Sequence, residues 1–561
     1  MQGRVILPVP RFTSHREPTM SPHSSSLGSH RTAGARDFID TLMQGIEAGW
    51  LEPQLTRFDL PRLARAVAQC TTHPFGSIDN RSFRAFPEET SPGLLMRVAM
   101  GLARHESHPD EQALTFFTLM SNGEFLPAAQ VLRHVGTSSA PTLEGIMTLA
   151  TPGACNYTSK WCSGDTLDWS SLAADTWPPS FAGCCIGLNV WHADLETFLT
   201  GIVSDPTVTT MLWLPDLFMK RLAEDGNWTL LPPHQCPELN GLYGAAFEAR
   251  YLAHEQRVAQ EPGLPHECVR ARTLWQRLLQ LLSHNSGPGL MFRDTCNLAS
   301  LQRHAGMIHG PSADGALLLN SDADTVATAV RGIINLERHL DGSHVDHKRL
   351  QHTARLAVRM LDNAIELLAP DARSGHTLCH YRSQGIAPGG VTAALDGIDA
   401  APSDRYSSLE TLISHFAHAI MRASHQLACE RGPCPAFHGS LWQQGALPQD
   451  AARMIRHERG DQWCDLPAAE ETLATEALRH DISRDGIRNL ALMANGLAPD
   501  LTQLPIPLEG EELSLEETAR LQSEFDQAWA IMPPLIERSA EALDYYIYKA
   551  WRLGLRSLTL K

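Results

Sequence analysis

The chain has 561 residues, of which 43% are hydrophobic and 19% charged, a balance typical of folded globular proteins rather than of fibres or disordered tails. The 46 basic and 63 acidic residues give a formal net charge of −17, which argues against an extended nucleic-acid surface, because binding a polyphosphate takes clustered Lys and Arg. No apolar run has the length of a transmembrane helix, and 12 cysteines spread over this length are typical of reduced thiols, so we expect a cytoplasmic protein without membrane or nucleic-acid partners.

The first 36 residues are rich in Ser, His, Pro and Arg, and their one acidic residue is Glu17. This composition predicts a disordered leader over 1–36, because it cannot bury enough apolar surface to order itself. A transit peptide or an over-extended start upstream of Met20 would look similar. From Asp37 onward, apolar residues three and four apart predict a helical N-terminal region over 37–120, with clear examples at 38–51 and 94–103.

The rest of the chain alternates short apolar stretches with long amphipathic ones. The stretch CCIGLNVW at 184–191 predicts a buried strand, and the periodic segments 346–368 and 407–432 predict two long helices. A last helix is expected over 521–554, interrupted at Pro533-Pro534. The pattern indicates an α/β core over 121–561.

Eight segments, in this order along the chain, resemble the large catalytic subunit of ribonucleotide reductase, especially the aerobic class I form. The most distinctive are LNVWHADLETFL and LWLPDLFMKRLAEDGNWTLL. The eight segments span 89–103, 125–137, 188–199, 212–251, 287–297, 334–342, 385–395 and 485–494. The resemblance implies a helical N-terminal region followed by a shortened ten-stranded α/β barrel, with a finger loop reaching its centre.

The resemblance also implies a radical mechanism, and each catalytic position of the family can be compared with the residue found here. In that family a thiyl radical on the finger cysteine abstracts the ribose 3′ hydrogen, a Glu acts as general base and an Asn orients the sugar hydroxyl. Two further cysteines supply reducing equivalents, and a C-terminal Tyr-Tyr pair relays the radical from a diiron small subunit. These roles need a labile S–H, a carboxylate or a redox-active phenol.

The finger positions of this chain lack those groups. The family lead-in is matched by RDTCNLASLQRHAGMIHG, and the finger motif Ser-Asn-Leu-Cys-x-Glu then falls on residues 312–317. On this alignment Ala313 replaces the orienting Asn, Gly315 the radical Cys and Leu317 the base. We therefore predict no catalytic residues here and no cofactor.

Other family positions are also changed. No cysteine occurs at 138–143 or 329–333, where the two redox cysteines are expected, and Thr559-Leu560 stand at the Tyr-Tyr positions. Tyr545, Tyr546 and Tyr548 are predicted to serve packing rather than radical relay. The loop expected to bind phosphate is Leu497-Ala498-Pro499-Asp500, and the region that reads allosteric nucleotides is shortened to 173–182.

Displaced thiols and metal sites are the remaining chemical alternatives. Cys296, Cys155 and Cys162 are candidate displaced thiols, although the lead-in alignment accounts for Cys296 more simply. The spacing of Cys155, Cys162, Cys184 and Cys185 is unusual for zinc, so buried structural cysteines are favoured. A second group near a helix end is disfavoured as a metal site because histidine is frequent in this chain; it comprises His415, His418, Cys429, Cys434 and His438.

Three hypotheses follow. The first is a reductase homologue that has lost radical chemistry and acts by binding a nucleotide-like ligand, a second copy of itself or a small-subunit-like protein. The second is an active enzyme with displaced thiols, or the same barrel used for other chemistry on a nucleotide-like substrate. The third is an eroding paralogue with no selected role. The simultaneous loss of several chemical positions, while packing motifs persist, favours the first.

Overall fold

The structure is a computed structural model. Its helices and strands form a mixed α/β architecture that begins with a helical region, as predicted from the sequence. The residues that it describes are 27–70, 83–139, 145–149, 159–162, 184–201, 208–261, 263–284, 287–322, 326–368, 372–398, 403–466, 473–496, 504, 506, 513–530 and 538–558.

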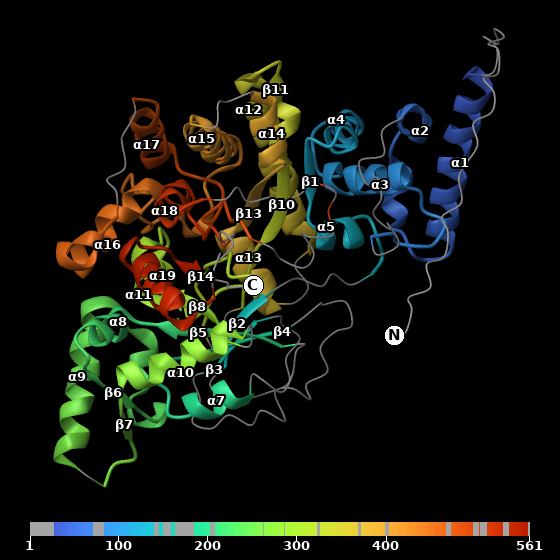
Figure 1. Cartoon of the computed structure of the whole chain (residues 1–561). Coiled ribbons are helices and arrows are strands. Elements are labelled where there is room, and N and C mark those ends of the chain that lie inside the picture. Colours follow the sequence, from blue (N-terminus) through green and yellow to red (C-terminus); the bar gives the residue numbers. More distant parts are fainter. Residues whose placement is uncertain are drawn as a thin grey trace, which may run out of the picture.

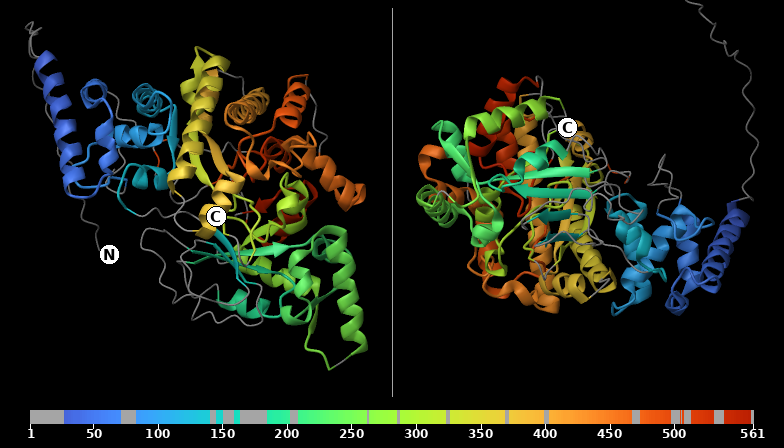
Figure 2. Two further views of the ribbon diagram at one scale, coloured as in Figure 1. Left: turned by 180° about the vertical axis from the view of Figure 1, so that it is seen from behind. Right: turned by 90° about the horizontal axis from the view of Figure 1, so that it is seen from below.

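The helical region lies at one end of the molecule, beside α12 and a small sheet (Figures 1 and 2). Side-chain caps fix the N-termini of two helices in this region. The Asp59 side chain accepts a hydrogen bond from the Arg62 amide and caps α2, and the Thr90 side chain accepts one from the Gly93 amide and caps α3. Its helices are α1 (Leu27–Glu47), α2 (Leu60–Gln69), α3 (Ser91–Ala103) and α4 (Pro109–Ser121).

Helix α1 extends into the segment predicted as the leader. The helix begins at Leu27, ten residues before the expected boundary at Asp37. Once Phe38 and Leu42 anchor its later turns in the core, adding turns toward the N-terminus costs little, because helix propagation is easier than nucleation. Residues 1–26 of the predicted leader lie outside the described part of the chain.

Two sheets build the α/β part. The larger has the order β14-β8-β5-β4-β3-β2-β9, in which β2, β3, β4, β5 and β8 run parallel. Its strands are β2 (Gly145–Leu149), β3 (Ser159–Cys162), β4 (Cys184–Asn189), β5 (Val208–Leu214), β8 (Gly289–Phe292), β9 (Ala327–Thr328) and β14 (Ser557–Leu558). The strand predicted at 184–191 is therefore confirmed as β4.

The smaller sheet follows directly, because one residue, Ala329, separates β9 from β10. Strand β10 pairs antiparallel with β1 and parallel with β13, and all three strands are buried along their length. They are β1 (Phe125–Pro127), β10 (Val330–Asn335) and β13 (Gln384–Gly389). Single bridges, Ile386 to Met493 and Asn495 to Trp529, continue the sheet beyond β13.

These strands form two sheets and, within the described residues, no closed ring of hydrogen bonds. The strands of the expected ten-stranded barrel are thus arranged in two sheets that do not close into a ring within the described residues. The physical reason is that the segments beyond β13 pair through single residues rather than through full strands. Two short antiparallel pairs lie apart from both sheets, β6 (Asn227–Leu230) with β7 (Glu267–Arg270) and β11 (Leu340–Asp341) with β12 (His344–Val345).

Helices α12 (His347–Leu368) and α15 (Arg405–Arg431) agree with the predicted helices to within two residues. They pack against each other, and α12 lies across β10 with Leu350, Ala357 and Leu361 in the core. The other helices are α5 (Ala129–His134), α7 (Leu195–Gly201), α8 (Asp216–Ala223), α9 (Gly244–Gln260), α10 (Ala271–Ser283), α11 (Arg293–Ala299), α13 (Ala372–Tyr381), α14 (Val391–Ile398), α16 (Ala451–Arg459), α17 (Leu473–Asp485), α18 (Leu515–Ser523) and α19 (Ala540–Arg552).

The expected last helix over 521–554 is two helices. Helix α18 ends at Ser523, residues 525–530 are buried without forming a helix, and α19 begins at Ala540. The break comes earlier than the Pro533-Pro534 pair, which lies outside the described residues. Buried Asp526 lies in this connection, and its carboxylate accepts the amides of Leu492 and Met493, which holds the chain after α18 against the segment that follows α17.

No helix among the described residues has both the length and the apolar character needed to cross a bilayer.

Candidate functional site

The finger segment predicted over 312–317 is a tight turn. Ser312 accepts the Gly315 amide on its carbonyl oxygen at 2.8 Å and donates its own amide to the Leu317 carbonyl at 3.0 Å. Its hydroxyl oxygen accepts the Leu317 amide at 2.9 Å. Gly315 has φ +76°, in the left-handed region where a side chain is disfavoured. The turn closes on a bridge between Pro311 and Leu318.

Three contacts attach this turn to distant segments. Arg331, on β10, donates from Nη2 to Asp314 Oδ2 at 2.7 Å, and both side chains are buried. The Leu318 amide donates to Gln527 Oε1 at 2.7 Å, and the Ala528 amide donates to the Ala316 carbonyl at 2.9 Å. The backbone of the turn is thereby bonded to the segment between α18 and α19.

Asp314 is ionised despite its burial. Burial by itself would raise the pKa of its carboxyl group, but the charge and hydrogen bond of Arg331, together with the Ser312 hydroxyl, hold that pKa below its usual value. The pair is therefore a neutralised buried charge, and its oxygen atoms are occupied by protein donors.

Apolar groups fill the surroundings of the turn. Gly385 on β13 approaches so closely that a Cβ there would lie 3.1 Å from the Leu317 side chain. A Cβ on Gly496 would collide with the side chains of Ala316 and Asp314. One apolar cluster contains Ala316, Leu317, Met211, Trp213, Met291 and Cys296, with Ala313 against it. Ala313, Gly315 and Leu317 thus place a methyl group, a hydrogen and an isobutyl group where the resemblance implies an amide, a thiol and a carboxylate.

Cys296 is the displaced-thiol candidate that the structure locates best. It lies on α11, belongs to the same apolar cluster as Leu317, and is 1% exposed. Its S–H donates to the Arg556 carbonyl at 3.3 Å, and burial raises the pKa of the thiol well above its ordinary value. Such a thiol is a structural donor rather than a nucleophile. Cys155 and the side chain of Cys162 lie outside the described residues.

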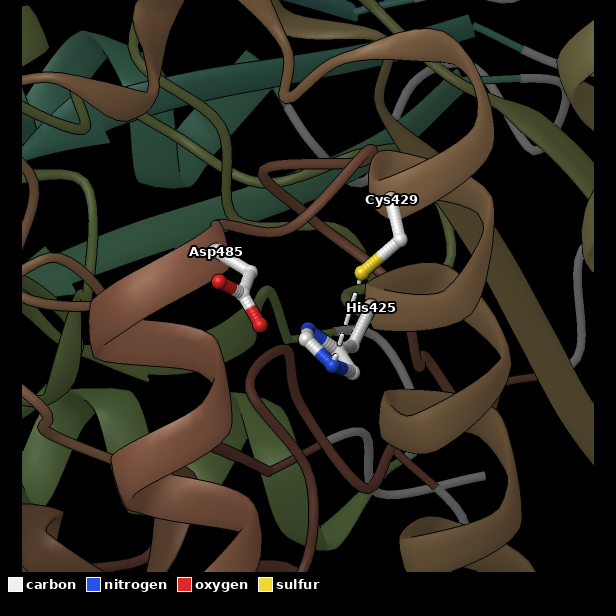
Figure 3. A group of neighbouring side chains, drawn as sticks. All are labelled: His425, Cys429 and Asp485. Atoms are coloured by element: carbon white, nitrogen blue, oxygen red, sulfur yellow. Dashed lines mark hydrogen bonds between the residues drawn. The ribbon is translucent and has the colours of Figure 1, made fainter.

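The second group, near the end of α15 and disfavoured as a metal site from the sequence, does not come together as one cluster. Cys429 does not join His415, whose ring packs against His347 with centroids 4.2 Å apart, nor Cys434, which is buried. Instead, Cys429 lies with His425 and Asp485, and their ligand atoms are all within 4.8 Å of one another (Figure 3). Sequence inspection missed this group, although the His425–Cys429 spacing of four within a predicted helix was available as a signal.

A third charged centre, also missed, surrounds Asp362 on α12. This fully buried carboxylate contacts the guanidinium groups of Arg382 at 2.7 Å, Arg431 at 3.1 Å and Arg488 at 3.3 Å. Burial opposes its ionisation, but the three arginines lower its pKa. Arg431 also binds Glu106, which follows α3, at 2.7 Å. The centre therefore connects the helical region to the barrel.

The family follows from comparison with known proteins. The family model "Ribonucleotide reductase, barrel domain" matches residues 181–502, more than half of the chain, and "Ribonucleotide reductase, all-alpha domain" matches 79–140. The chain belongs to the ribonucleotide reductase large-subunit family. Both the helical region and the barrel are thereby confirmed as those of this family, while the exact boundaries predicted at 36 and 120 stay predictions.

Curated relatives of this reductase homologue cover most of it. The "Ribonucleoside-diphosphate reductase subunit alpha" of Chlamydia muridarum is 31% identical over 516 residues, which is 81% of this chain and 48% of the relative. The "large chain" of Neurospora crassa is 30% identical over 333 residues, 56% of this chain and 33% of the relative. The Variola virus "large subunit" is 25% identical over 460 residues, 72% and 56% respectively. The chain thus covers between a third and just over half of the length of these relatives.

The remaining family positions are placed only in part. Residues 330–333 form the start of β10, directly after Ala329, and Arg331 on this strand contacts the finger turn. Tyr545 is 67% exposed, whereas Tyr546 and Tyr548 pack against the core beside α10. The segments 140–143, 173–182, 497–500 and 559–561 lie outside the described residues.

Proposed function

We propose that this reductase homologue has lost radical-based ribonucleotide reduction and acts as a binding protein. The observation that carries the proposal is Gly315, a left-handed glycine at the position that aligns with the radical cysteine. Its ligand would be nucleotide-like, and its protein partner would be a second copy or a small-subunit-like protein. No cofactor is proposed, and a cytoplasmic location stays a prediction.

The chemistry of the finger turn supports this proposal. Hydrogen-atom abstraction needs a sulfur radical, and the base and orienting roles need a carboxylate and an amide. The turn carries Asp314 as its one carboxylate, but this group is bonded to Arg331 and Ser312. A cysteine at Gly315 would also have to adopt a conformation that costs an L-residue about 1–2 kcal/mol. The local backbone is thus suited to glycine rather than to an exposed thiol.

The active-enzyme alternative has one observation in its favour. Cys296 lies in the same apolar cluster as the finger turn, so a sulfur atom is present in this part of the core. Against it, the Cys296 S–H donates to the Arg556 carbonyl, so the hydrogen that radical chemistry would have to remove is already held in a hydrogen bond. We propose a structural role for Cys296.

The decisive test is a reductase assay on the full chain. Purified protein is incubated with the four ribonucleoside diphosphates or triphosphates, with dithiothreitol, and with either a class I small subunit or adenosylcobalamin. We expect no deoxynucleotide above the no-protein control. Deoxynucleotide formation would overturn the proposal, and its abolition in Cys296→Ala, with Cys268→Ala as the exposed-cysteine control, would establish the displaced-thiol enzyme.

Binding is tested separately by isothermal titration calorimetry with the same nucleotides. A saturable heat with about one site per chain is expected if ligand binding has been retained. A flat titration would remove the ligand part of the proposal. Light scattering with and without the small subunit then tests the protein-partner part, for which a constant monomer mass would be the contradicting result.

A further inference from the structure

His425, Cys429 and Asp485 face one another at the junction of two helices. His425 and Cys429 lie one turn apart on α15, and Asp485 is the last residue of α17. Figure 3 shows the imidazole, thiol and carboxylate groups pointing into the same space from two sides. Their ligand atoms lie within 4.8 Å of one another, so a small rotation of each side chain would bring all three to one ion.

The hydrogen bonds of His425 orient its ring for such a role. Nδ1 lies 3.1 Å from the carbonyl oxygen of Gly486, and since a carbonyl only accepts, Nδ1 carries the proton. Nε2 therefore presents a lone pair toward Cys429 Sγ, 3.7 Å away. An imidazole whose other nitrogen donates to a backbone carbonyl is the usual arrangement of a metal-binding histidine. His425 is also largely buried, at 9% exposure, which holds the ring in place.

The donor set selects the kind of metal. One nitrogen, one sulfur and one oxygen suit a borderline divalent ion such as Zn²⁺, whereas Mg²⁺ and Ca²⁺ take oxygen ligands. Three protein ligands leave a fourth tetrahedral position for water or for Asp481, which precedes Asp485 by one turn of α17. Cys429 and Asp485 are partly exposed to solvent, so an ion can reach them.

We propose that His425, Cys429 and Asp485 form a Zn²⁺ site that joins the end of α15 to the end of α17. On binding, the Cys429 thiol releases its proton to solvent and bonds as the thiolate, without any change of oxidation state. The site is independent of the proposed loss of reductase activity, because it lies on helices outside the finger turn.

Arg484 is the competing partner of this site. It binds both oxygens of Asp485, at 2.9 Å and 2.7 Å, and also Asp481 at 3.1 Å. The Arg484 pairs are solvent-exposed, and exposed pairs are weak. Each carboxylate oxygen has a second lone pair, so Asp485 can accept hydrogen bonds from Arg484 and coordinate the ion at the same time. Removing Arg484 should therefore tighten metal binding.

The two segments that the ion would join also supply the Asp362 centre. Arg431 follows Cys429 by two residues, Arg488 follows Asp485 by three, and both contact the Asp362 carboxylate. Zinc at this junction would limit the separation of α15 and α17 and thereby hold those arginines in place. A rise in the unfolding temperature on adding Zn²⁺ is the expected consequence.

The test is a Co²⁺ titration of the full, reduced chain, followed by displacement with Zn²⁺. We expect one equivalent of Co²⁺, intense tetrahedral d–d bands and a thiolate-to-cobalt charge-transfer band, all lost when Zn²⁺ is added. Cys429→Ser should abolish the charge-transfer band, and His425→Gln, which removes a direct ligand, should weaken binding by more than the about 10- to 100-fold that loss of an outer-shell partner costs. The matched control is Cys268→Ser, which removes another exposed cysteine and should leave the titration unchanged.

Arg484→Gln supplies a second, independent arm, since its side chain is exposed and the variant should fold normally. Several-fold tighter binding of Co²⁺ is expected. Absence of the charge-transfer band in the native chain, or its persistence in Cys429→Ser, would overturn the proposal, as would a native unfolding temperature that Zn²⁺ leaves unchanged.

Discussion

Asp314 and Asp362 are both buried, ionised carboxylates with lowered pKa values, but they differ in the number and origin of their partners. Asp314 has one guanidinium partner, Arg331, on a neighbouring strand. Asp362 has three, which come from three separate segments of the chain. The first is a local pair that holds one turn, and the second is a junction that holds several elements together.

The difference shows how charge is used in this reductase homologue. At the finger turn the one positive charge of Arg331 neutralises the one negative charge of Asp314, and both side chains are buried. At Asp362 the extra arginines extend outward to Glu106 and Glu366, so that the excess positive charge is neutralised at the periphery. Both arrangements stabilise the architecture, and the one at the finger turn keeps its carboxylate engaged beside the positions where the resemblance predicts catalytic groups.

The largest effect is expected from Asp362→Ala. Removing this carboxylate leaves Arg382, Arg431 and Arg488 close together without their common partner, and breaking a buried pair costs about 3–5 kcal/mol. Urea denaturation followed by circular dichroism should show a correspondingly lower midpoint. Asp396→Ala, at an exposed carboxylate paired with Arg405, is the control and should stay within about 0.5 kcal/mol. Equal midpoints for the two variants would contradict the proposed junction.

Asp314→Ala should have the next largest effect, a loss of about 3 kcal/mol, because the buried Arg331 guanidinium loses its carboxylate partner. The double variant Asp314→Leu/Arg331→Met should recover most of this loss, since replacing a buried pair by apolar groups of similar volume is often neutral. A double-mutant cycle built from the urea midpoints of Asp314→Leu, Arg331→Met and the double variant measures the coupling. If the stability losses of the two single variants add up to that of the double variant, Asp314 and Arg331 do not act as a pair.

The same pair predicts a pH dependence. Since the pKa of Asp314 is lower in the folded than in the unfolded state, the unfolded chain binds its proton first as the pH falls. The contribution of this carboxylate is therefore present above its ordinary pKa of 3.8 and is lost as the solution is acidified below that value. Urea midpoints should fall less steeply with acid in Asp314→Asn than in the native chain. Parallel curves would exclude Asp314 as the titrating group.

Gly315→Cys tests the finger turn directly. The left-handed conformation should cost about 1–2 kcal/mol, and reductase activity should not appear, because Ala313 and Leu317 still lack the orienting and basic groups. Gly241→Cys is the control, since its Cβ would meet no atom within 4 Å and its φ is not in the left-handed range. Unchanged stability in Gly315→Cys would show that the turn readily accommodates a thiol.

The smallest effect is expected from Cys296→Ala, about 1 kcal/mol, from the loss of one buried sulfur and its weak hydrogen bond. Nucleotide binding by calorimetry should not change. A loss of binding in this variant would assign Cys296 to a ligand site rather than to packing.

Sequence patterns predicted the elements whose information is local. Helices α12 and α15 and strand β4 were placed to within about two residues, because each buries one face at the period of its own backbone. The ordered segments that resemble the reductase family also predict that Ala313, Gly315 and Leu317 occupy the finger positions, and this assignment stays a prediction. The early end of α18 was not foreseen, and neither were the hydrogen bonds that Asp526 accepts from amides more than 30 residues away in the chain.

The sequence by itself determined which chemical groups are present: no sulfur at Gly315, no carboxylate at Leu317, and a His–Cys pair one turn apart on α15. Only the tertiary structure decided what those groups meet. Arg331 reaches Asp314, and Asp485 reaches His425 and Cys429, across 17 and at least 56 residues of chain. Such partners are chosen by the packing of strands and helices that are distant in sequence, and no local periodicity encodes that choice.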